Sequence, residues 1–195
     1  MLLEVIRGCM FSGKTEELLR RLNRLRYARQ KGALYKPVLD DRYSVDSVMT
    51  HDWKVFPSKP ITFPQEILED KPLVDVVAVD EVMFFGFQGL TDIIEVFERL
   101  ISLYNRIIVT GLDTDFRGEP VRVIADLLAM CDEDVHLKAV CTVCGEEATR
   151  TQRIKEDGRP AHYEDSLIVV GGEEEYEARC RKHHEVPGKG VYNRI

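Results

Sequence analysis

Three observations predict an α/β fold, in which helices cover a mainly parallel sheet and a small second domain follows. Short apolar stretches alternate with stretches whose apolar residues recur at helical spacing. A glycine-rich segment separates the first pair, and after about residue 139 short polar stretches with four candidate metal ligands replace the alternation. We therefore expect residues 1–138 to form the core domain and residues 139–195 the second domain, with a loose tail from Val186.

The first part of the chain predicts a strand, a helix and a second strand. Leu2–Ile6 is a short apolar run, Glu16–Gln30 carries leucines at helical spacing, and Ala33–Tyr35 is a further short strand candidate. We expect Gly32 to end the helix, because glycine readily adopts the conformation that terminates helices. Pro37–Pro64 has no sustained period, which indicates a functional loop or an irregular insertion.

The rest of the core repeats this alternation. Nearly continuous apolar runs are typical of strands that are buried on both faces. The expected elements are a helix at Gln65–Glu69, a strand at Leu73–Val79, a helix at Leu90–Leu103, a strand at Arg106–Thr110, a helix at Ile124–Met130 and a strand at Val135–Val140.

The glycine-rich segment fits the P-loop pattern G-x-x-x-x-G-K-[ST] and lies between a predicted strand and a predicted helix. In such a loop successive backbone N–H groups point at phosphate oxygens, and the start of the helix adds partial positive charge. Lys14 can reach the β- and γ-phosphates, and the Thr15 hydroxyl can bind Mg²⁺. The predicted ATP-binding residues of the loop are Gly8, Cys9, Met10, Phe11, Ser12, Gly13, Lys14 and Thr15.

Two acidic residues close the apolar run that ends at Val79. Asp80 is placed as a Walker B carboxylate, which supports Mg²⁺ beside the bound nucleotide. Glu81 follows at once, and a carboxylate near the γ-phosphate can accept a proton from an attacking hydroxyl. The alternative is an ordinary acidic strand end near a turn.

The second domain carries two pairs of candidate metal ligands. Cys141 and Cys144 form a C-x-x-C pair, and Cys180 and His183 form a C-x-x-H pair. Four such ligands suit tetrahedral Zn²⁺ and leave no open coordination position, which predicts a structural zinc. His184 is a rival for the fourth ligand, and ordinary buried cysteines are the alternative to a metal site.

Composition and charge exclude some classes of protein. The net charge is -7, so a nucleic-acid partner is not expected, and the basic run from Arg20 to Lys31 is best explained as a solvated helix surface. No stretch reaches the roughly 20 apolar residues of a membrane span. Five cysteines with a C-x-x-C pair favour a reducing compartment, and we expect the cytoplasm.

Cys9 lies inside the P-loop, apart from these pairs. Main-chain N–H donors around a thiol lower its pKa and make it more reactive. We therefore expect Cys9 to be a site of oxidative inactivation.

Seven segments, in order, resemble the type II (zinc-containing) thymidine kinase family from about Leu2 to Glu185. They read GCMFSGKT, KPVLDDRYS, AVDEVMFFG, TGLDTDFRGEP, CTVCGEEATRTQR, VGGEEEYEARC and RKHH. The resemblance implies a P-loop core with a zinc-binding lasso domain, assembled as a homotetramer. It also implies transfer of the ATP γ-phosphate to the 5′-hydroxyl of thymidine, giving dTMP in nucleotide salvage, with feedback binding of dTTP.

The same resemblance implies roles for residues that match the family's motifs. Glu81 matches the catalytic base, and Asp40 and Arg42 match residues that assist with phosphate and metal. The nucleoside pocket is matched by Met10, Phe84, Leu112, Phe116, Thr151 and Tyr176. The lasso that reads the pyrimidine through its main chain is matched by Val169, Val170, Gly171 and Gly172.

The chain departs from the family pattern at three positions. Family members commonly carry Gln where this chain has Met83, and many carry Pro where it has Cys9. Met83 removes a polar group near the pocket and makes deoxyuridine a second candidate acceptor. His183 stands where some relatives have Cys, and both residues bind Zn²⁺.

Three other hypotheses come from different classes. A P-loop ATPase that grips nucleic acid with a zinc ribbon would need a basic ribbon, yet glutamates are clustered there. A regulatory GTPase would need an N-K-x-D motif, which is absent. An inactive zinc-binding module would not need the intact set of Lys14, Thr15, Asp80 and Glu81.

Overall fold

The computed structural model describes residues 1–39, 47–49, 55–87, 93–169 and 171–190. In this part of the chain, six strands form one sheet in the order β5-β2-β6-β7-β1-β8, and every neighbouring pair is parallel. The strands are β1 (Leu2–Arg7), β2 (Gly32–Pro37), β5 (Lys59–Ile61), β6 (Val76–Val79), β7 (Arg106–Gly111) and β8 (Glu133–His136). The predicted α/β fold with a parallel sheet is confirmed.

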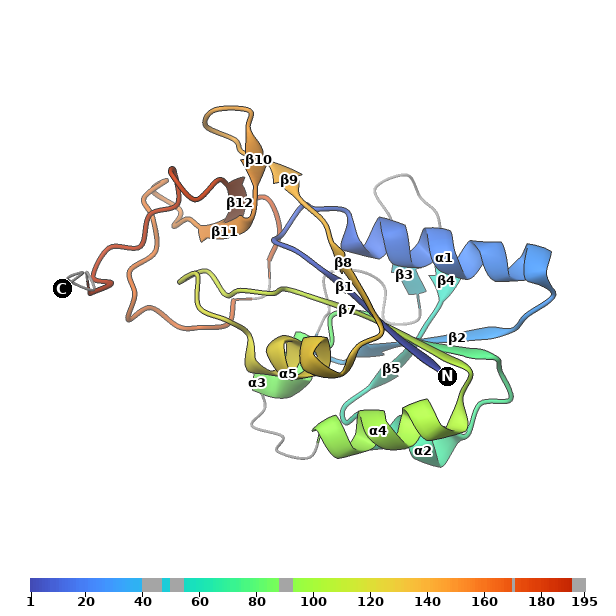
Figure 1. The fold of residues 1–195 in the computed structure, drawn as a ribbon. Coiled ribbons are helices and arrows are strands. Elements are labelled where there is room, and N and C mark those ends of the chain that lie inside the picture. Colours follow the sequence, from blue (N-terminus) through green and yellow to red (C-terminus); the bar gives the residue numbers. More distant parts are fainter. Residues whose placement is uncertain (40–46, 50–54, 88–92, 170, 191–195) are drawn as a thin grey trace.

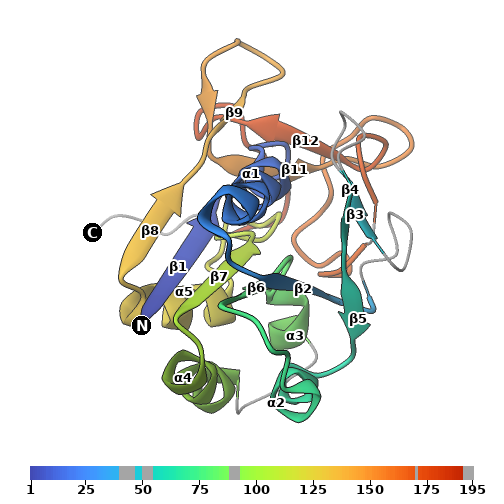
Figure 2. The same cartoon turned by 90° about the vertical axis from the view of Figure 1, so that its right-hand side faces the viewer.

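Helices cover both faces of this sheet, as Figures 1 and 2 show. Helix α1 (Lys14–Ala28) packs on one face against alternate strand residues such as Val76, Ala78 and Ile108. The intervening residues, such as Val77 and Val79, face the opposite layer. That layer consists of α2 (Gln65–Asp70), α3 (Met83–Phe87), α4 (Ile93–Leu103) and α5 (Arg122–Met130). The strands are buried on both faces, which explains their continuous apolar runs.

A smaller unit of short antiparallel strands lies beyond the P-loop end of the sheet (Figure 1). It contains two pairs, in which β9 (Ala139–Val140) joins β10 (Glu147–Ala148) and β11 (Arg150–Arg153) joins β12 (Tyr176–Arg179). A small cluster of buried residues attaches it to the P-loop, because Cys9 packs with Ala139, Cys141, Ala148 and Ala178.

The described residues of the segment Pro37–Pro64 are more regular than the sequence predicts. It contains a short antiparallel pair, β3 (Ser47–Met49) with β4 (Val55–Pro57), and it contributes β5 to the edge of the main sheet. Three-residue strands are too short to show a period, and the proline within β5 is tolerated because an edge strand leaves backbone groups unpaired.

Helix α1 ends before Gly32, so the predicted role of this glycine is wrong. Arg29 is the left-handed residue after the helix, with φ 56°, and the N–H of Gln30 bonds to the carbonyl of Leu25. Gly32 instead starts β2. A Cβ there would lie 2.8 Å from Leu25 Cδ1, so glycine allows the close packing of α1 on the strand.

Two predicted strands also needed correction. Leu73 is 92% exposed, and the strand begins only at Val76. The run Val135–Val140 divides into β8 and β9, which belong to different sheets because the chain leaves the main sheet at Leu137. The short helix α3 was not predicted, because its sequence MFFGF is apolar throughout and shows no period.

In the segment from Val186, for which a loose tail is expected, two residues make hydrogen bonds with the rest of the chain. The N–H of Tyr163 donates to the Pro187 carbonyl at 2.8 Å, and Lys189 Nζ donates to the Arg117 carbonyl. Residues 191–195 lie outside the described part of the chain. Among the described residues, no helix combines the length and apolar character that crossing a membrane requires.

Candidate active site

The P-loop connects strand β1, which lies between β7 and β8, to α1 at the carboxyl end of the sheet. Gly8 has φ 156°, and a side chain there would collide with the Leu137 carbonyl oxygen. Within the loop, Ser12 Oγ donates to the Cys9 carbonyl at 2.8 Å, and Lys14 Nζ donates to the same oxygen at 2.9 Å. The loop is therefore curled tightly, with the ammonium group of Lys14 held against it.

Asp80, which the sequence predicts as a Walker B carboxylate, lies beside the P-loop. Thr15 Oγ1 donates to Asp80 Oδ2 at 3.2 Å. On its other side, Asp80 accepts a short hydrogen bond from the Thr110 hydroxyl. The hydroxyl and the carboxylate supply oxygen ligands of the kind that Mg²⁺ prefers.

Glu81 follows Asp80 in an unusual backbone conformation. Its φ is 49°, in the left-handed region that non-glycine residues rarely adopt, and its side chain is buried. Its N–H donates to Thr110 Oγ1 at 3.1 Å, and the next N–H, of Val82, donates to the Thr110 carbonyl at 2.9 Å. Strain of this kind is retained where the surroundings hold the backbone firmly, often at functional sites.

Thr110 was not among the predicted site residues, although it holds the Asp80 carboxylate and the backbone of Glu81. It is the penultimate residue of β7, which lies beside β6 in the sheet, and it is fully buried. In the sequence, Thr110 is a polar residue at the end of an apolar strand, which is a pattern that could have identified it as a candidate site residue. This pattern becomes informative only when β6 and β7 are known to be neighbours, because Asp80 and Glu81 follow β6.

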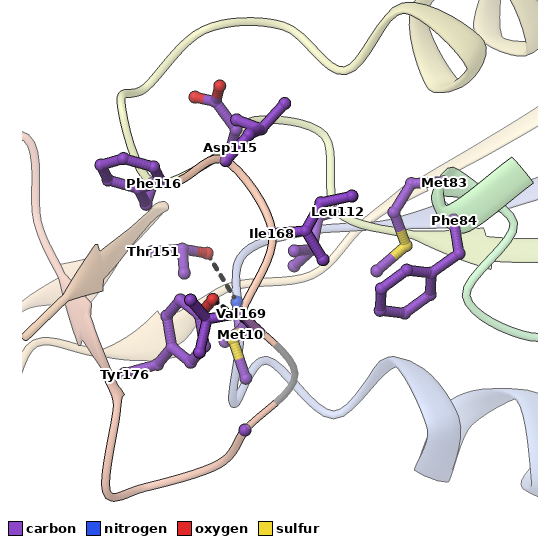
Figure 3. A pocket seen from close by; sticks show the side chains of 12 residues that line it. Met10, Met83, Phe84, Leu112, Asp115, Phe116, Thr151, Ile168, Val169 and Tyr176 are labelled. Carbon is purple, nitrogen blue, oxygen red and sulfur yellow. Dashed lines mark hydrogen bonds between the residues drawn. The ribbon is translucent and has the colours of Figure 1, made fainter. Parts of the chain in front are cut away.

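A narrow cavity of about 50 Å³ lies next to these groups (Figure 3). Its lining includes most of the residues that the resemblance assigns to the nucleoside: Met10, Phe84, Leu112, Phe116, Thr151, Val169, Gly171 and Tyr176. Gly172 lies beside the cavity, where its N–H donates to Glu175. Val170, Asp40 and Arg42 lie outside the described residues.

Four further residues line the cavity without having been predicted as nucleoside ligands: Met83, Asp115, Leu167 and Ile168. Met83 stood out only as a departure from the family pattern. The carboxylate of Asp115 accepts the N–H groups of Arg117 and Glu119, each at 2.9 Å. Burial raises the pKa of Asp115 above its usual value, although these two N–H groups oppose the rise.

The walls of the cavity are fixed by hydrogen bonds between segments that are far apart in the sequence. Thr151 Oγ1 accepts the N–H of Met10 at 3.1 Å, and the Tyr176 hydroxyl donates to the Val169 carbonyl at 2.7 Å (Figure 3). The guanidinium of Arg153 lies 4.5 Å from the centre of the Phe116 ring, within the range of a cation–π contact.

The two predicted ligand pairs come together in the small unit. Ligand atoms of Cys141, Cys144, Cys180 and His183 all lie within 4.8 Å of one another. Cys144 Sγ is 3.9 Å from Cys180 Sγ, and Cys180 Sγ is 3.3 Å from His183 Nδ1. Tetrahedral Zn²⁺ with Zn–S bonds of about 2.3 Å requires sulfur atoms about 3.8 Å apart, so the cluster fits a metal ion.

The cluster also favours ionised sulfur. Burial opposes ionisation of Cys141, but nearby N–H groups of Cys180, Cys144 and Val143 lower the pKa of its thiol to about 5. The rival ligand His184 points elsewhere, because its Nε2 lies 2.8 Å from the carbonyl oxygen of Phe116. Burial lowers the pKa of His184.

The predicted reactivity of Cys9 is not supported. Its side chain is fully buried, and Sγ donates to the Ala148 carbonyl at 3.4 Å. Burial raises the pKa of the Cys9 thiol, although Lys14 opposes the rise. A buried thiol with a raised pKa is a poor nucleophile, so oxidation at Cys9 is not expected to control activity.

The phosphate-binding loop, the carboxylates and the cavity are contiguous. Met10 belongs to the P-loop and also lines the cavity, while Met83 and Phe84 follow Glu81 after the single residue Val82. A group held in the cavity would therefore face the end of a nucleotide bound on the loop. This arrangement defines the class of P-loop phosphotransferases, in which positioning and charge neutralisation provide most of the catalysis.

Comparisons with known proteins define the family within that class. The thymidine kinase family profile matches residues 1–184. A thymidine kinase of Coprothermobacter proteolyticus is 49% identical over 187 residues, which are 96% of this chain and 92% of that protein. The chain belongs to the thymidine kinase family, and it is an enzyme that phosphorylates thymidine.

A solved structure of a DNA replication initiation factor shows a weak overall likeness. Its TM-score is 0.41 at 17% sequence identity, and the match covers 70% of this chain and 40% of that chain. A likeness at this level carries no argument about function.

Proposed function

We propose that this thymidine kinase transfers the γ-phosphate of ATP to the 5′-hydroxyl of thymidine, giving dTMP for nucleotide salvage, with Glu81 as the general base. The observation that carries the assignment is the Thr110 hydroxyl, which accepts the Glu81 N–H while donating to Asp80. This contact supports a base held beside the metal-binding carboxylate, where an attacking hydroxyl must lose its proton.

The remaining roles follow from the chemistry of each group. Backbone N–H groups of residues 8–15 bind the phosphates, and Lys14 neutralises charge that develops on the transferred group. Thr15 and Asp80 would hold Mg²⁺, since their side-chain oxygens already lie 3.2 Å apart. When bound, Mg²⁺ supplies charge neutralisation between the β- and γ-phosphates. We include Asp40 and Arg42 as phosphate- and metal-assisting residues on the strength of the family resemblance.

The cavity would hold the pyrimidine among apolar side chains. Phe84, Phe116 and Tyr176 provide aromatic surface, and the main chain of residues 169–172 would provide hydrogen bonds to the base. Its present volume of about 50 Å³ admits only a few water molecules. We propose that thymidine enters by movement of the segment that contains Val169, whose carbonyl accepts a hydrogen bond from the Tyr176 hydroxyl. Reclosure would exclude water from the reaction.

We propose the following organisation for the rest of the molecule. Residues 1–138 form the kinase domain, and residues 139–195 form a lasso domain held by a structural Zn²⁺ on Cys141, Cys144, Cys180 and His183. Feedback binding of dTTP and a homotetramer follow from the family resemblance. The thiols of the proposed zinc ligands fit a reducing compartment, which supports the cytoplasm.

The role of Glu81 is tested with Glu81→Gln, which keeps the size of the side chain and removes its basicity. Loss of a general base lowers kcat by about 10²–10⁴-fold, and we expect the KM for thymidine to change little. Glu95→Gln, an exposed change on α4, serves as the matched control and should leave kcat unaltered. A Glu81→Gln enzyme with wild-type kcat and an unchanged melting temperature would exclude Glu81 as the base.

A further inference from the structure

His184 is a partly buried polar residue that the proposed mechanism does not use. It follows the metal ligand His183, yet its ring turns away from the cluster. Its Nε2 lies 2.8 Å from the carbonyl oxygen of Phe116. Because a carbonyl oxygen can only accept, Nε2 carries the proton and donates it.

The ring of His184 lies against the loop that carries the aromatic wall of the cavity. A Cβ on Gly118 would lie only 3.3 Å from His184 Cε1, so ring and loop are in close contact. Figure 3 shows Phe116 at the cavity, on the same side as Thr151. The imidazole thus holds the backbone of a residue whose side chain lines the cavity.

The next residue, Glu185, links the same segment by hydrogen bonds to a second wall of the cavity. The N–H of Glu185 donates to Gln152 Oε1 at 2.8 Å, and Gln152 Nε2 donates to the Glu185 carbonyl at 2.9 Å. Gln152 directly follows Thr151, which lines the cavity. Residues 183–185 therefore contact, one after the other, the metal cluster, the Phe116 loop and strand β11.

We propose that His184 is a positioning residue for the thymidine pocket, which fixes the backbone of Phe116 to the segment that carries the metal cluster. Arg153 holds the Phe116 ring by a cation–π contact, whereas His184 holds its carbonyl. Without the donor, a buried carbonyl loses its partner and the aromatic wall loses its fixed place. Thymidine as the ligand of this pocket rests on the proposed function, but the positioning role of His184 does not.

The test compares two variants of nearly equal size and shape. In His184→Gln the amide nitrogen can replace the Nε2 donor, and in His184→Met the donor is lost while the apolar body remains. The first readout is amide hydrogen exchange in residues 113–121 of the full-length enzyme without substrate. The others are zinc per chain and the separate KM values for thymidine and ATP.

We expect His184→Met to speed exchange in this loop and to raise the KM for thymidine by about tenfold, the effect of losing one buried hydrogen bond. The KM for ATP, the kcat and the zinc content should stay close to wild type. His184→Gln should resemble wild type throughout. Equal exchange in the two variants would overturn the proposal, as would loss of zinc from His184→Met alone.

Two controls keep the result interpretable. In ¹⁵N-histidine spectra of the wild-type protein, the proposal requires one Nε2 proton that is protected from solvent, and its absence would overturn the proposal even if His184→Met did not fold. A wild-type enzyme that failed to phosphorylate thymidine would defeat the proposed function. The exchange comparison would still decide the role of His184.

Discussion

At the scale of single residues, the Thr110 hydroxyl connects Asp80, the proposed Mg²⁺ ligand, to Glu81, the proposed base. It donates to Asp80 and accepts from the N–H of Glu81, and no part of it is exposed. One hydroxyl thereby sets the direction of the Asp80 side chain and supports the left-handed backbone at Glu81. Both effects are needed before substrate binds, which is the preorganisation that catalysis by positioning requires.

Thr110→Val removes this hydroxyl and preserves the shape of the side chain. We expect kcat to fall by about 10- to 100-fold, because the Asp80 carboxylate and the Glu81 backbone lose their common support. The free energy of unfolding should fall by about 1–2 kcal/mol, the cost of unsatisfied buried polar groups. Steady-state kinetics and urea unfolding measure the two effects.

Thr114→Val is the matched control for this experiment. The Thr114 hydroxyl is buried, and among the described residues it has no hydrogen-bond partner. Its removal should therefore leave kcat unchanged. Equal kinetic losses in the two variants would contradict a specific role for Thr110.

At the scale of elements, helix α1 ends at Arg29, a residue type that rarely adopts the left-handed backbone conformation found there. Arg29 adopts a left-handed conformation, in which every residue with a Cβ is disfavoured. The hydrogen bonds around it, from Arg29 N–H to Arg26 and from Gln30 N–H to Leu25, form the usual pattern of a glycine-terminated helix.

Arg29→Gly should therefore stabilise the protein. Relief of the left-handed strain is expected to raise the free energy of unfolding by about 0.5–1 kcal/mol. Chemical denaturation of the full chain measures this change in the free energy of unfolding. Arg26→Gly, within the last turn of the same helix, should have the opposite sign and cost about 1 kcal/mol. A loss of stability in Arg29→Gly would show that the arginine side chain contributes more than its strain costs.

Ion pairs on α1 give a prediction with a defined pH dependence. Hydrogen bonds from Arg20 and then Arg21 lower the pKa of Glu17 from 4.5 to about 2. Because the folded-state pKa is the lower one, Glu17 stays ionised in the folded protein while the unfolded chain takes up a proton. The stability that ionised Glu17 contributes is fully present above its pKa in the unfolded chain, and it is lost as the pH falls towards 2.

Glu17→Gln should lower the free energy of unfolding by about 1 kcal/mol at neutral pH, a modest value because solvent screens the exposed Arg20. The difference from wild type should shrink as the pH falls below 4.5, to about half or less at pH 3, and disappear as the pH approaches 2. Urea unfolding across this range provides the test. A difference that stayed constant down to pH 3 would mean that Glu17 acts through packing and not through its charge.

The elements and site groups that could be predicted from sequence are those encoded by local patterns. The P-loop, the Asp80–Glu81 pair and the C-x-x-C and C-x-x-H pairs each need only a few neighbouring residues. Thr110 depends on which strands are adjacent, and Ile168 lines the cavity because of a long connection between β11 and β12. Helix α3 and strand β5 are too short to show a period, so they appear only when tertiary packing holds them.

At the scale of the whole molecule, the small unit joins the core beside the P-loop, and the cavity needs both parts. Met10 and Phe84 come from the core, whereas Thr151 and Tyr176 come from β11 and β12. These strands are short, and the metal cluster lies beside them, with Cys180 following β12 directly. Binding energy of a structural metal in such a unit is folding energy.

Cys144→Ser tests this dependence by removing one proposed metal ligand. We expect zinc to fall well below about one ion per chain, with a lower melting temperature and a higher KM for thymidine. Metal analysis and calorimetry check the outcome. Cys131→Ser is the control, since Cys131 lies outside the cluster and donates to the Leu128 carbonyl. Full zinc content in Cys144→Ser would contradict the four-ligand assignment.

The most direct measurement is the release of ADP from Mg-ATP by the wild-type enzyme, with thymidine, other nucleosides or single-stranded DNA added separately. The predicted result is turnover that depends on thymidine and produces dTMP. Single-stranded DNA should have no effect, because the net charge of -7 provides little attraction for its backbone. Turnover that ignored thymidine and rose with DNA would contradict the account and favour an ATPase that acts on nucleic acid.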